Sequence, residues 1–127
     1  MIENQEKLDK EIGTEEIEKL KPEKVKIEKV EVISVGEGKS KAEKVVCFCN
    51  HSAQEDPIKI SSVEYLKNKN VKITGLWYKE DSTGKLQKGS ALALFMEFVG
   101  AKTIRELENK EVMTSEDEKG YLCFRAY

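Results

Sequence analysis

The stretch GSALALFMEFVGAKTIRELENKEV, residues 89–112, decides the predicted fold because it reads as a helix followed by a turn and a strand. Ser90 is a typical helix N-cap, and Gly100 stands where a left-handed helix stop belongs. Apolar residues between them recur at intervals of three and four positions: Leu92, Leu94, Phe95, Phe98 and Val99. This spacing predicts one helix of about ten residues.

The residues after this helix predict one more helical turn before a strand begins. Thr103 and Glu106 have the spacing of a capping box and enclose the apolar residue Ile104, with Leu107 directly after. The chain then enters a predicted strand over residues 111–114.

The first predicted strand changes phase in its middle. Val25 and Ile27 alternate with polar residues, whereas Val30 and Val32 continue the alternation in the opposite phase. A β-bulge near residues 28–29 accounts for the change and lets a long strand curl.

Short β-favouring runs between turn residues predict the remaining elements. We expect further strands over residues 43–51, 58–60, 71–78 and 121–127. Residues 36–40 are predicted as a turn, 61–70 as irregular or one helical turn, and 80–88 as a loop or small hairpin using Leu86.

A length of 127 residues with 39% hydrophobic side chains suits one domain with one modest core. We place this domain at residues 22–127 and interpret residues 1–21 as an acidic helical N-terminal arm. Seven acidic and three basic side chains give residues 1–20 a net charge of −4. The arm could dock on the domain, stay mobile or cover a basic surface, and these alternatives remain open.

Three main strands, one helix and two further strands follow one another in the domain. This is the order of the OB fold, a five-stranded Greek-key barrel, with the helix between the third and fourth strands. The predicted fold class is therefore mainly β (α+β), an OB-fold-like barrel with an N-terminal helical arm.

A resemblance to a known family points in the same direction. Residues 90–112 and the late pair Gly120 and Tyr121 resemble the C-terminal half of small phage and archaeal proteins related to single-stranded-DNA-binding proteins. The residues that match are Ala91 to Gly100, Ile104, Leu107 and Lys110 to Val112. Asn109 stands where that pattern has glycine, and asparagine also tolerates a left-handed backbone. The resemblance covers about a third of the chain and implies an OB-fold protein that binds single-stranded DNA.

The net charge of −2 is distributed unevenly, since residues 58–88 sum to +4 and residues 97–118 to −4. Composition does not show a strongly basic nucleic-acid binder, and the charges also fit an ordinary solvated surface. Almost all charged residues are Lys and Glu, a bias found in proteins from hot environments and from AT-rich genomes. With the family resemblance, it fits a thermophile, archaeal or viral source.

No apolar run approaches the roughly 18 residues that a membrane span needs, and residues 1–20 are too acidic for a signal peptide. We therefore expect a cytoplasmic location and no membrane partner.

Three side chains at alternate positions, Cys47, Cys49 and His51, are a candidate metal cluster, with Cys123 approaching from the last strand. Structural zinc sites place cysteines on turns where the thiolates converge, whereas strand positions two apart are separated by about 6.6 Å. We predict reduced, buried cysteines, with no metal and no cofactor.

No residue pattern identifies a catalytic site. His51 has no serine, cysteine or carboxylate at a catalytic spacing, and Gly84 with Lys85 lacks the strand and helix that flank a phosphate loop. The acidic run 116–118 lies in a predicted turn. We predict a protein without enzymatic activity.

Alternation along two strands predicts which side faces a ligand. The core side of residues 71–78 is predicted to carry Val71, Ile73, Gly75 and Trp77, and the outer side Leu76 with its alternating neighbours. The predicted nucleic-acid-binding residues, on the outer side and at the hairpin tip, are Lys39, Lys41, Lys44, Phe48, Asn50, Lys72, Thr74 and Tyr78.

Aromatic rings flanked by lysines suit single-stranded nucleic acid, because bases stack on rings and lysines follow the phosphates. We therefore predict non-catalytic binding of single-stranded nucleic acid, with DNA favoured over RNA. The alternative is a protein-interaction module of the same fold in a viral, replication or repair assembly. A separate alternative for Phe48 and Tyr78 is that the arm or a partner subunit covers them. Pathway, sequence preference and oligomeric state remain open.

Overall fold

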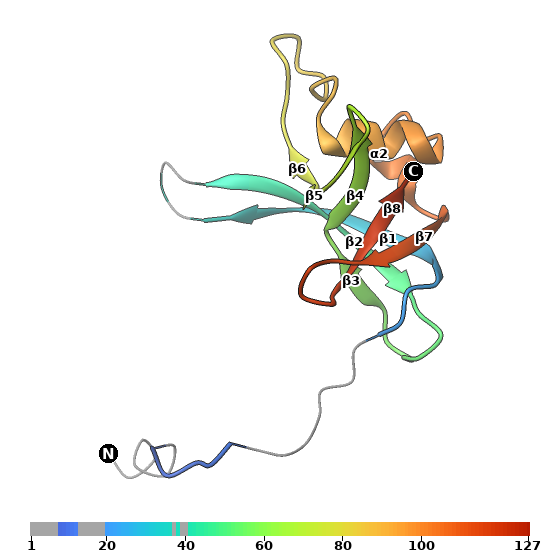
Figure 1. The fold of residues 1–127 in the computed structure, drawn as a ribbon. Helices are drawn as coiled ribbons and strands as arrows, with labels where there is room; N and C mark the ends of the chain where they lie inside the picture. The colour runs from blue at the N-terminus through green and yellow to red at the C-terminus, as the bar shows by residue number, and fades with distance from the viewer. Residues whose placement is uncertain (1–7, 13–19, 37, 39–40) are drawn as a thin grey trace.

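The computed structural model describes residues 8–12, 20–36, 38 and 41–127. In this part of the chain the protein is mainly β, with eight strands in one sheet and one α-helix packed against it (Figure 1). The strands are β1 (Lys24–Val35), β2 (Ala42–Asn50), β3 (Ile58–Ile60), β4 (Ser62–Lys67), β5 (Asn70–Gly75), β6 (Trp77–Tyr78), β7 (Glu111–Glu116) and β8 (Leu122–Ala126).

The two longest strands, β1 and β2, form an antiparallel ribbon that extends away from the rest of the sheet (Figure 1). The pairing register shifts between Ile27 and Lys29, which confirms the predicted bulge. Beyond the bulge Val32 is exposed, whereas Val25 and Ile27 before it are fully buried. The bulge therefore divides β1 into a core half and an outer half.

The predicted five-stranded barrel is not closed, which corrects the expectation from the sequence. Hydrogen-bonded neighbours follow the open order β3-β2-β1-β7-β8-β4-β5, with β6 paired to β2 outside this path. β3 and β4 follow one another along the chain with Ser61 between them and do not pair with each other, so the path ends at β3 on one side and continues through β4 to β5 on the other. β4 pairs in parallel with β8.

Residues 61–70 differ from their prediction as an irregular segment or helical turn. Most of them form β4, which pairs antiparallel with β5 in full register from Ser62 with Gly75 to Lys67 with Asn70. The two residues of the turn, Asn68 and Lys69, have φ of 51° and 67°. Two successive positive φ values are the mark of a tight hairpin turn.

Helix α2 (Ala91–Val99) confirms the prediction from residues 89–112. The Ser90 hydroxyl accepts a hydrogen bond from the Ala93 N–H, and Gly100 ends the helix with φ of 79°. The buried face of α2 contributes Leu92, Phe95 and Met96 to the core. The Phe95 ring stacks on Phe124 of β8 with ring centroids 4.7 Å apart, which fixes the helix against the sheet.

The segment after α2 also confirms its prediction. The Glu106 carboxylate accepts hydrogen bonds from the N–H groups of Lys102 and Thr103, and the Glu106 N–H donates to the Thr103 hydroxyl. This capping box precedes the 3-10 turn η2 (Arg105–Leu107). Asn109 has φ of 71°, a left-handed backbone that asparagine tolerates.

The predicted helical arm is not seen. In the described parts of the arm, Leu8 alone has helical backbone, residues 9–12 and 20–21 have none, and the rest of the arm lies outside the described residues. Leu8 and Ile12 are 82% and 97% exposed, so neither packs on the sheet. An isolated short helix without such packing is marginal in water.

Among the described residues, no helix is long and apolar enough to cross a membrane.

Candidate nucleic-acid interface

Trp77 lies on the opposite side from its predicted place in the core. The alternation breaks at Leu76, which belongs to neither β5 nor β6 and whose side chain is fully buried. Its N–H donates to the Ser61 carbonyl at 2.8 Å, and its carbonyl accepts from the Val45 N–H at 2.8 Å. Leu76 therefore fills the core position, and Trp77, only partly buried, pairs with Lys44 across β2 and β6.

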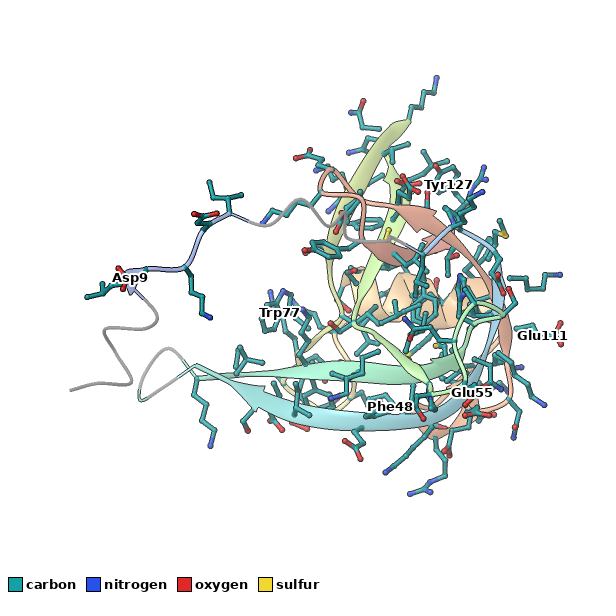
Figure 2. All side chains as sticks on the ribbon, turned by 90° about the horizontal axis from the view of Figure 1, so that it is seen from below. Asp9, Phe48, Glu55, Trp77, Glu111 and Tyr127 are labelled. Atoms are coloured by element: carbon teal, nitrogen blue, oxygen red, sulfur yellow. The ribbon has the colours of Figure 1, made fainter. Side chains whose placement is uncertain are left out.

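The Trp77 ring carries a cation on its face. Lys44 Nζ lies 5.0 Å from the ring centroid, within the range of a cation–π contact. Gly75 permits this arrangement, because an added Cβ would lie 2.8 Å from Lys44 Cε and 2.9 Å from Trp77 Nε1. Figure 2 shows Trp77 beside the β1–β2 ribbon. The local structure thus holds an indole and an ammonium together.

Trp77 lines a hollow of about 460 Å³ between the β4–β5 hairpin, β6 and the start of α2. We call it the basic hollow, defined by the rings of Tyr65 and Trp77 and by the lysines Lys67, Lys79 and Lys88. None of the described residues that line it is acidic. Two aromatic rings among uncompensated cations are suited to a planar, negatively charged ligand.

Two predicted residues on β5 belong to the same side as this hollow. Thr74 lines it directly. Lys72 pairs with Tyr65 in the β4–β5 register, so its side chain leaves the sheet on the face that Tyr65 occupies. Of these predicted residues, Thr74 lines the hollow and Lys44 contacts its Trp77 ring, whereas Lys72 shares the face of Tyr65 but is not among the lining residues.

Phe48 extends this surface along β2. It stands four residues from Lys44 on the same face, roughly 13 Å away at the rise of a strand. Lys29 Nζ and Lys59 Nζ lie 5.6 and 5.7 Å from its ring centroid. Lys29 also pairs with Glu31 at 2.8 Å, which raises the pKa of Lys29 and partly neutralises it.

Tyr78 faces the other way from Trp77, into a second hollow. This hollow of about 600 Å³ lies between the loop 79–90 and the C-terminal part of α2. We call it the apolar hollow, defined by Tyr78, Leu86, Met96, Ala101 and Ile104. The Tyr78 hydroxyl donates to Glu80 at 3.1 Å, and this bond to a carboxylate raises the pKa of Tyr78.

The remaining predicted binding residues are not gathered at the basic hollow. Asn50 Nδ2 donates to Glu28 Oε1 at 2.6 Å at the far end of β2. Lys41 is exposed just before β2 begins. Lys39 lies outside the described residues.

The loop 79–90 forms a wall of both hollows, and hydrogen bonds to the carboxylate of Asp81 hold its conformation. Asp81 Oδ1 accepts hydrogen bonds from the Thr83 hydroxyl and N–H and from the Lys85 N–H. These bonds, from Thr83 first and Lys85 second, hold the pKa of Asp81 below its usual value. Leu86 pairs with Glu80 across the loop, as the predicted small hairpin requires.

The residues considered as metal ligands lie in the core or beside it. Burial raises the pKa of the Cys49 thiol to about 12 and that of the Cys123 thiol to about 11, and it raises the pKa of Cys47 further. Buried thiols of this kind are poor nucleophiles and poor ligands. Across the described residues, no group of three or more His, Cys, Asp or Glu could hold a metal ion.

His51 makes two hydrogen bonds to the backbone close to the start of β1 and the end of β2. Its Nδ1 accepts the Ala53 N–H at 3.1 Å, so the ring proton lies on Nε2 and is donated to the Lys21 carbonyl at 2.8 Å. These bonds fasten the chain just before β1 to the end of β2.

Sequence reasoning missed the basic hollow as a site, because Tyr65 and Lys67 stand in the segment predicted as irregular and Trp77 was expected in the core. The alternation of Val63, Tyr65 and Lys67 was the signal that could have found it.

Comparisons of the chain with protein-family models, with curated proteins and with solved structures found no significant match.

Proposed function

We propose that this protein binds single-stranded nucleic acid at the basic hollow and along the adjoining face of β2. The observation that carries the proposal is the lining of this hollow, with Trp77 and Tyr65 among Lys67, Lys79 and Lys88 and no carboxylate among its described residues. Bases stack on aromatic rings without regard to sequence, while lysines neutralise the phosphates. The proposed role is binding alone, without a catalytic step.

The topology supports an OB-fold-like interpretation of the sheet. If β3 and β4 are counted as one strand bent at Ser61, the sheet path leaves this strand through β2 and returns to it through β8. The OB fold is a partly open five-stranded barrel that binds oligonucleotides on the face of its second and third strands. On this interpretation β5 is an addition that pairs with the β4 part of the bent strand, and Lys44 and Phe48 lie on the second strand.

The spacing of the aromatic rings supports a strand longer than one nucleotide. Trp77 lies opposite Lys44, and Phe48 stands four residues further along the same face of β2, between Lys29 and Lys59. We propose that the ligand runs from the basic hollow along β2 to Phe48. DNA is the favoured ligand over RNA, on the family resemblance alone.

The first test is binding of fluorescently labelled oligothymidylate and oligouridylate, followed by polarisation at several salt concentrations. Each lysine that contacts a phosphate contributes about −0.7 to the slope of log K against log salt, so the four lysines 44, 67, 79 and 88 give about −3. Absence of saturable binding at low salt would remove the proposal. Tight binding with no salt dependence would move the ligand away from these lysines.

The second test uses the tryptophan itself. Trp77 is the one tryptophan of the chain, so its emission reports on the basic hollow without labelling. Oligonucleotide should quench this emission with the affinity seen by polarisation. The matched control is Tyr78→Ala, whose Trp77 should be quenched equally because Tyr78 lies in the other hollow.

A further inference from the structure

The apolar hollow is a second concave surface that nucleic-acid binding does not use. Its floor consists of Met96 and Ala101, both buried, and its walls of the partly buried Leu86 and Ile104. Tyr78 completes it, with its hydroxyl already engaged by Glu80. Its volume of about 600 Å³ lies in the range of sites that take a small molecule or a few side chains.

The charged residues of this hollow have one predominant sign and stand on two sides. Lys85 and Lys88 come from the loop 79–90, and Lys102 follows the end of α2. Glu97 is the single acidic residue among the described residues of the lining. An occupant therefore meets aliphatic surface together with lysines from two separate segments of the chain.

We propose that the apolar hollow is the docking site of an acidic peptide segment of another protein, in which a large apolar side chain is flanked by carboxylates. The apolar side chain fills the space above Met96 and Ala101, and the carboxylates on its two sides pair with the lysines of the loop and with Lys102. Buried apolar anchors carry most of the affinity in such contacts, and charged rims supply selectivity. This inference does not rest on the proposed nucleic-acid site.

The lining also distinguishes this occupant from a nucleic acid. The floor and walls are aliphatic, and the one ring present, Tyr78, is fixed by its bond to Glu80. Nucleobases need partners for their polar edges as well as a stacking face, and aliphatic side chains supply neither. A leucine or phenylalanine side chain needs only the removal of its surface from water.

A charge-exchange experiment tests the proposal. The probe is a fluorescein-labelled peptide in which leucine and phenylalanine alternate with aspartate and glutamate, and its match replaces every acid with lysine. The double variant Lys85→Glu/Lys102→Glu reverses one charge in each segment at exposed positions and leaves Lys88, which lines both hollows, unchanged. The loop keeps its shape because Lys85 contributes only backbone groups to the Asp81 bonds.

The native protein should bind the acidic peptide saturably, and the double variant should weaken that binding by at least about tenfold. The variant should in turn bind the lysine peptide better than the native protein does. Lys67→Glu, which alters the basic hollow, should leave peptide affinity unchanged. Peptide binding that is absent, or equal in native protein and double variant, would overturn the proposal.

A truncation identifies any competing occupant from the same chain. Residues 1–20 are themselves acidic and contain isolated aliphatic residues. Deleting them should leave the peptide affinity unchanged. If the deletion tightens peptide binding severalfold, the occupant is this protein's own N-terminal segment, and the inference of an external partner is wrong.

Discussion

The two hollows on either side of the loop 79–90 share a wall but differ in lining. The basic hollow presents Trp77 and Tyr65 among lysines, with no acid among the described residues that line it. The apolar hollow presents aliphatic side chains together with lysines from two separate segments of the chain. Lys88 lines both. The loop 79–90 therefore separates two hollows of different chemistry, and we propose a different ligand for each.

The difference begins at two consecutive residues. Trp77 and Tyr78 are the whole of β6, and because neighbouring strand residues face opposite sides, one ring enters each hollow. Leu76, directly before them, sets this phase by filling the core. A shift of one residue in this segment would exchange the two rings.

The largest expected effect comes from removing the residue that sets the phase. Leu76→Ala should lower the free energy of unfolding by about 2–5 kcal/mol, because it deletes a fully buried side chain and leaves a cavity. Both hollows should lose affinity together in the destabilised protein. Chemical denaturation followed by circular dichroism measures the change. A loss of unfolding free energy below about 1 kcal/mol would show that Leu76 does not anchor the break in alternation between β5 and β6.

The next largest effect is on oligonucleotide binding, and it distinguishes Trp77 from Tyr78. Trp77→Ala should weaken oligonucleotide binding by about 1–3 kcal/mol through lost stacking, and Tyr78→Ala should leave it unchanged. Fluorescence polarisation measures both, and Phe48→Ala should resemble Trp77→Ala if the ligand reaches along β2. The reverse ranking, with Tyr78 sensitive and Trp77 inert, would place the ligand in the apolar hollow.

Some of the fold could be predicted because local rules decided it. Ser90 and Gly100 fix the ends of α2, Thr103 and Glu106 form their capping box, and the phase change in β1 marks its bulge. For the two caps the stabilising partners lie within a few residues, and for the bulge the change of phase is itself visible in the sequence, although its pairing partner is β2.

Other features could not be predicted, either because the local signal was atypical or because their partners lie far along the chain. The β4–β5 hairpin turns at Asn68 and Lys69, and lysine with a positive φ is not the expected residue for such a turn. The open path of the sheet depends on β3 pairing with β2 while β4 pairs with β5 and β8, and no periodicity in the sequence contains these partners.

The position of Trp77 was wrong for a related reason. The prediction carried one alternation through residues 71–78, whereas the backbone of Leu76 leaves the ladder to bond Ser61 and Val45. These are long-range bonds, so the break in phase has no local signature. The sequence could predict the kind of site, which is aromatic rings beside lysines. It could not predict that Trp77 and Tyr65 supply these rings.

A smaller effect tests how closely the basic hollow is packed. Gly75→Ala would place a Cβ within 3 Å of Lys44 Cε and Trp77 Nε1, so the lysine and indole must move. Displacing a side chain from its preferred rotamer costs about 0.5–1.5 kcal/mol, and oligonucleotide binding should weaken by a similar amount. Peptide binding at the apolar hollow should not change. Unaltered oligonucleotide affinity would show that the Lys44–Trp77 pair is not part of the site.

The smallest expected effect concerns the shared wall. Asp81 has a lowered pKa in the folded protein because its carboxylate accepts hydrogen bonds from Thr83 and Lys85. Its contribution to the stability of the loop is therefore complete at pH values above 3.8, the ordinary pKa of an aspartate. As the pH falls through the lower folded value, the carboxylate is protonated and the contribution is lost. The amide resonances of Thr83 and Lys85 should therefore titrate with a midpoint below 3.8, as nitrogen-15 NMR can measure.

The control for this titration is Asp81→Asn, which keeps an acceptor oxygen but has no proton to gain in that range. Its Thr83 and Lys85 amides should show no transition, and both ligands should bind it nearly as they bind the native protein at neutral pH. Asp81→Ala removes the acceptor altogether. It should slightly lower the affinity of both hollows for their ligands, because Lys79, Lys85 and Lys88 belong to the same loop. A midpoint at or above 3.8, or an alanine variant that affects only one hollow, would mean that the two sites are not joined through Asp81.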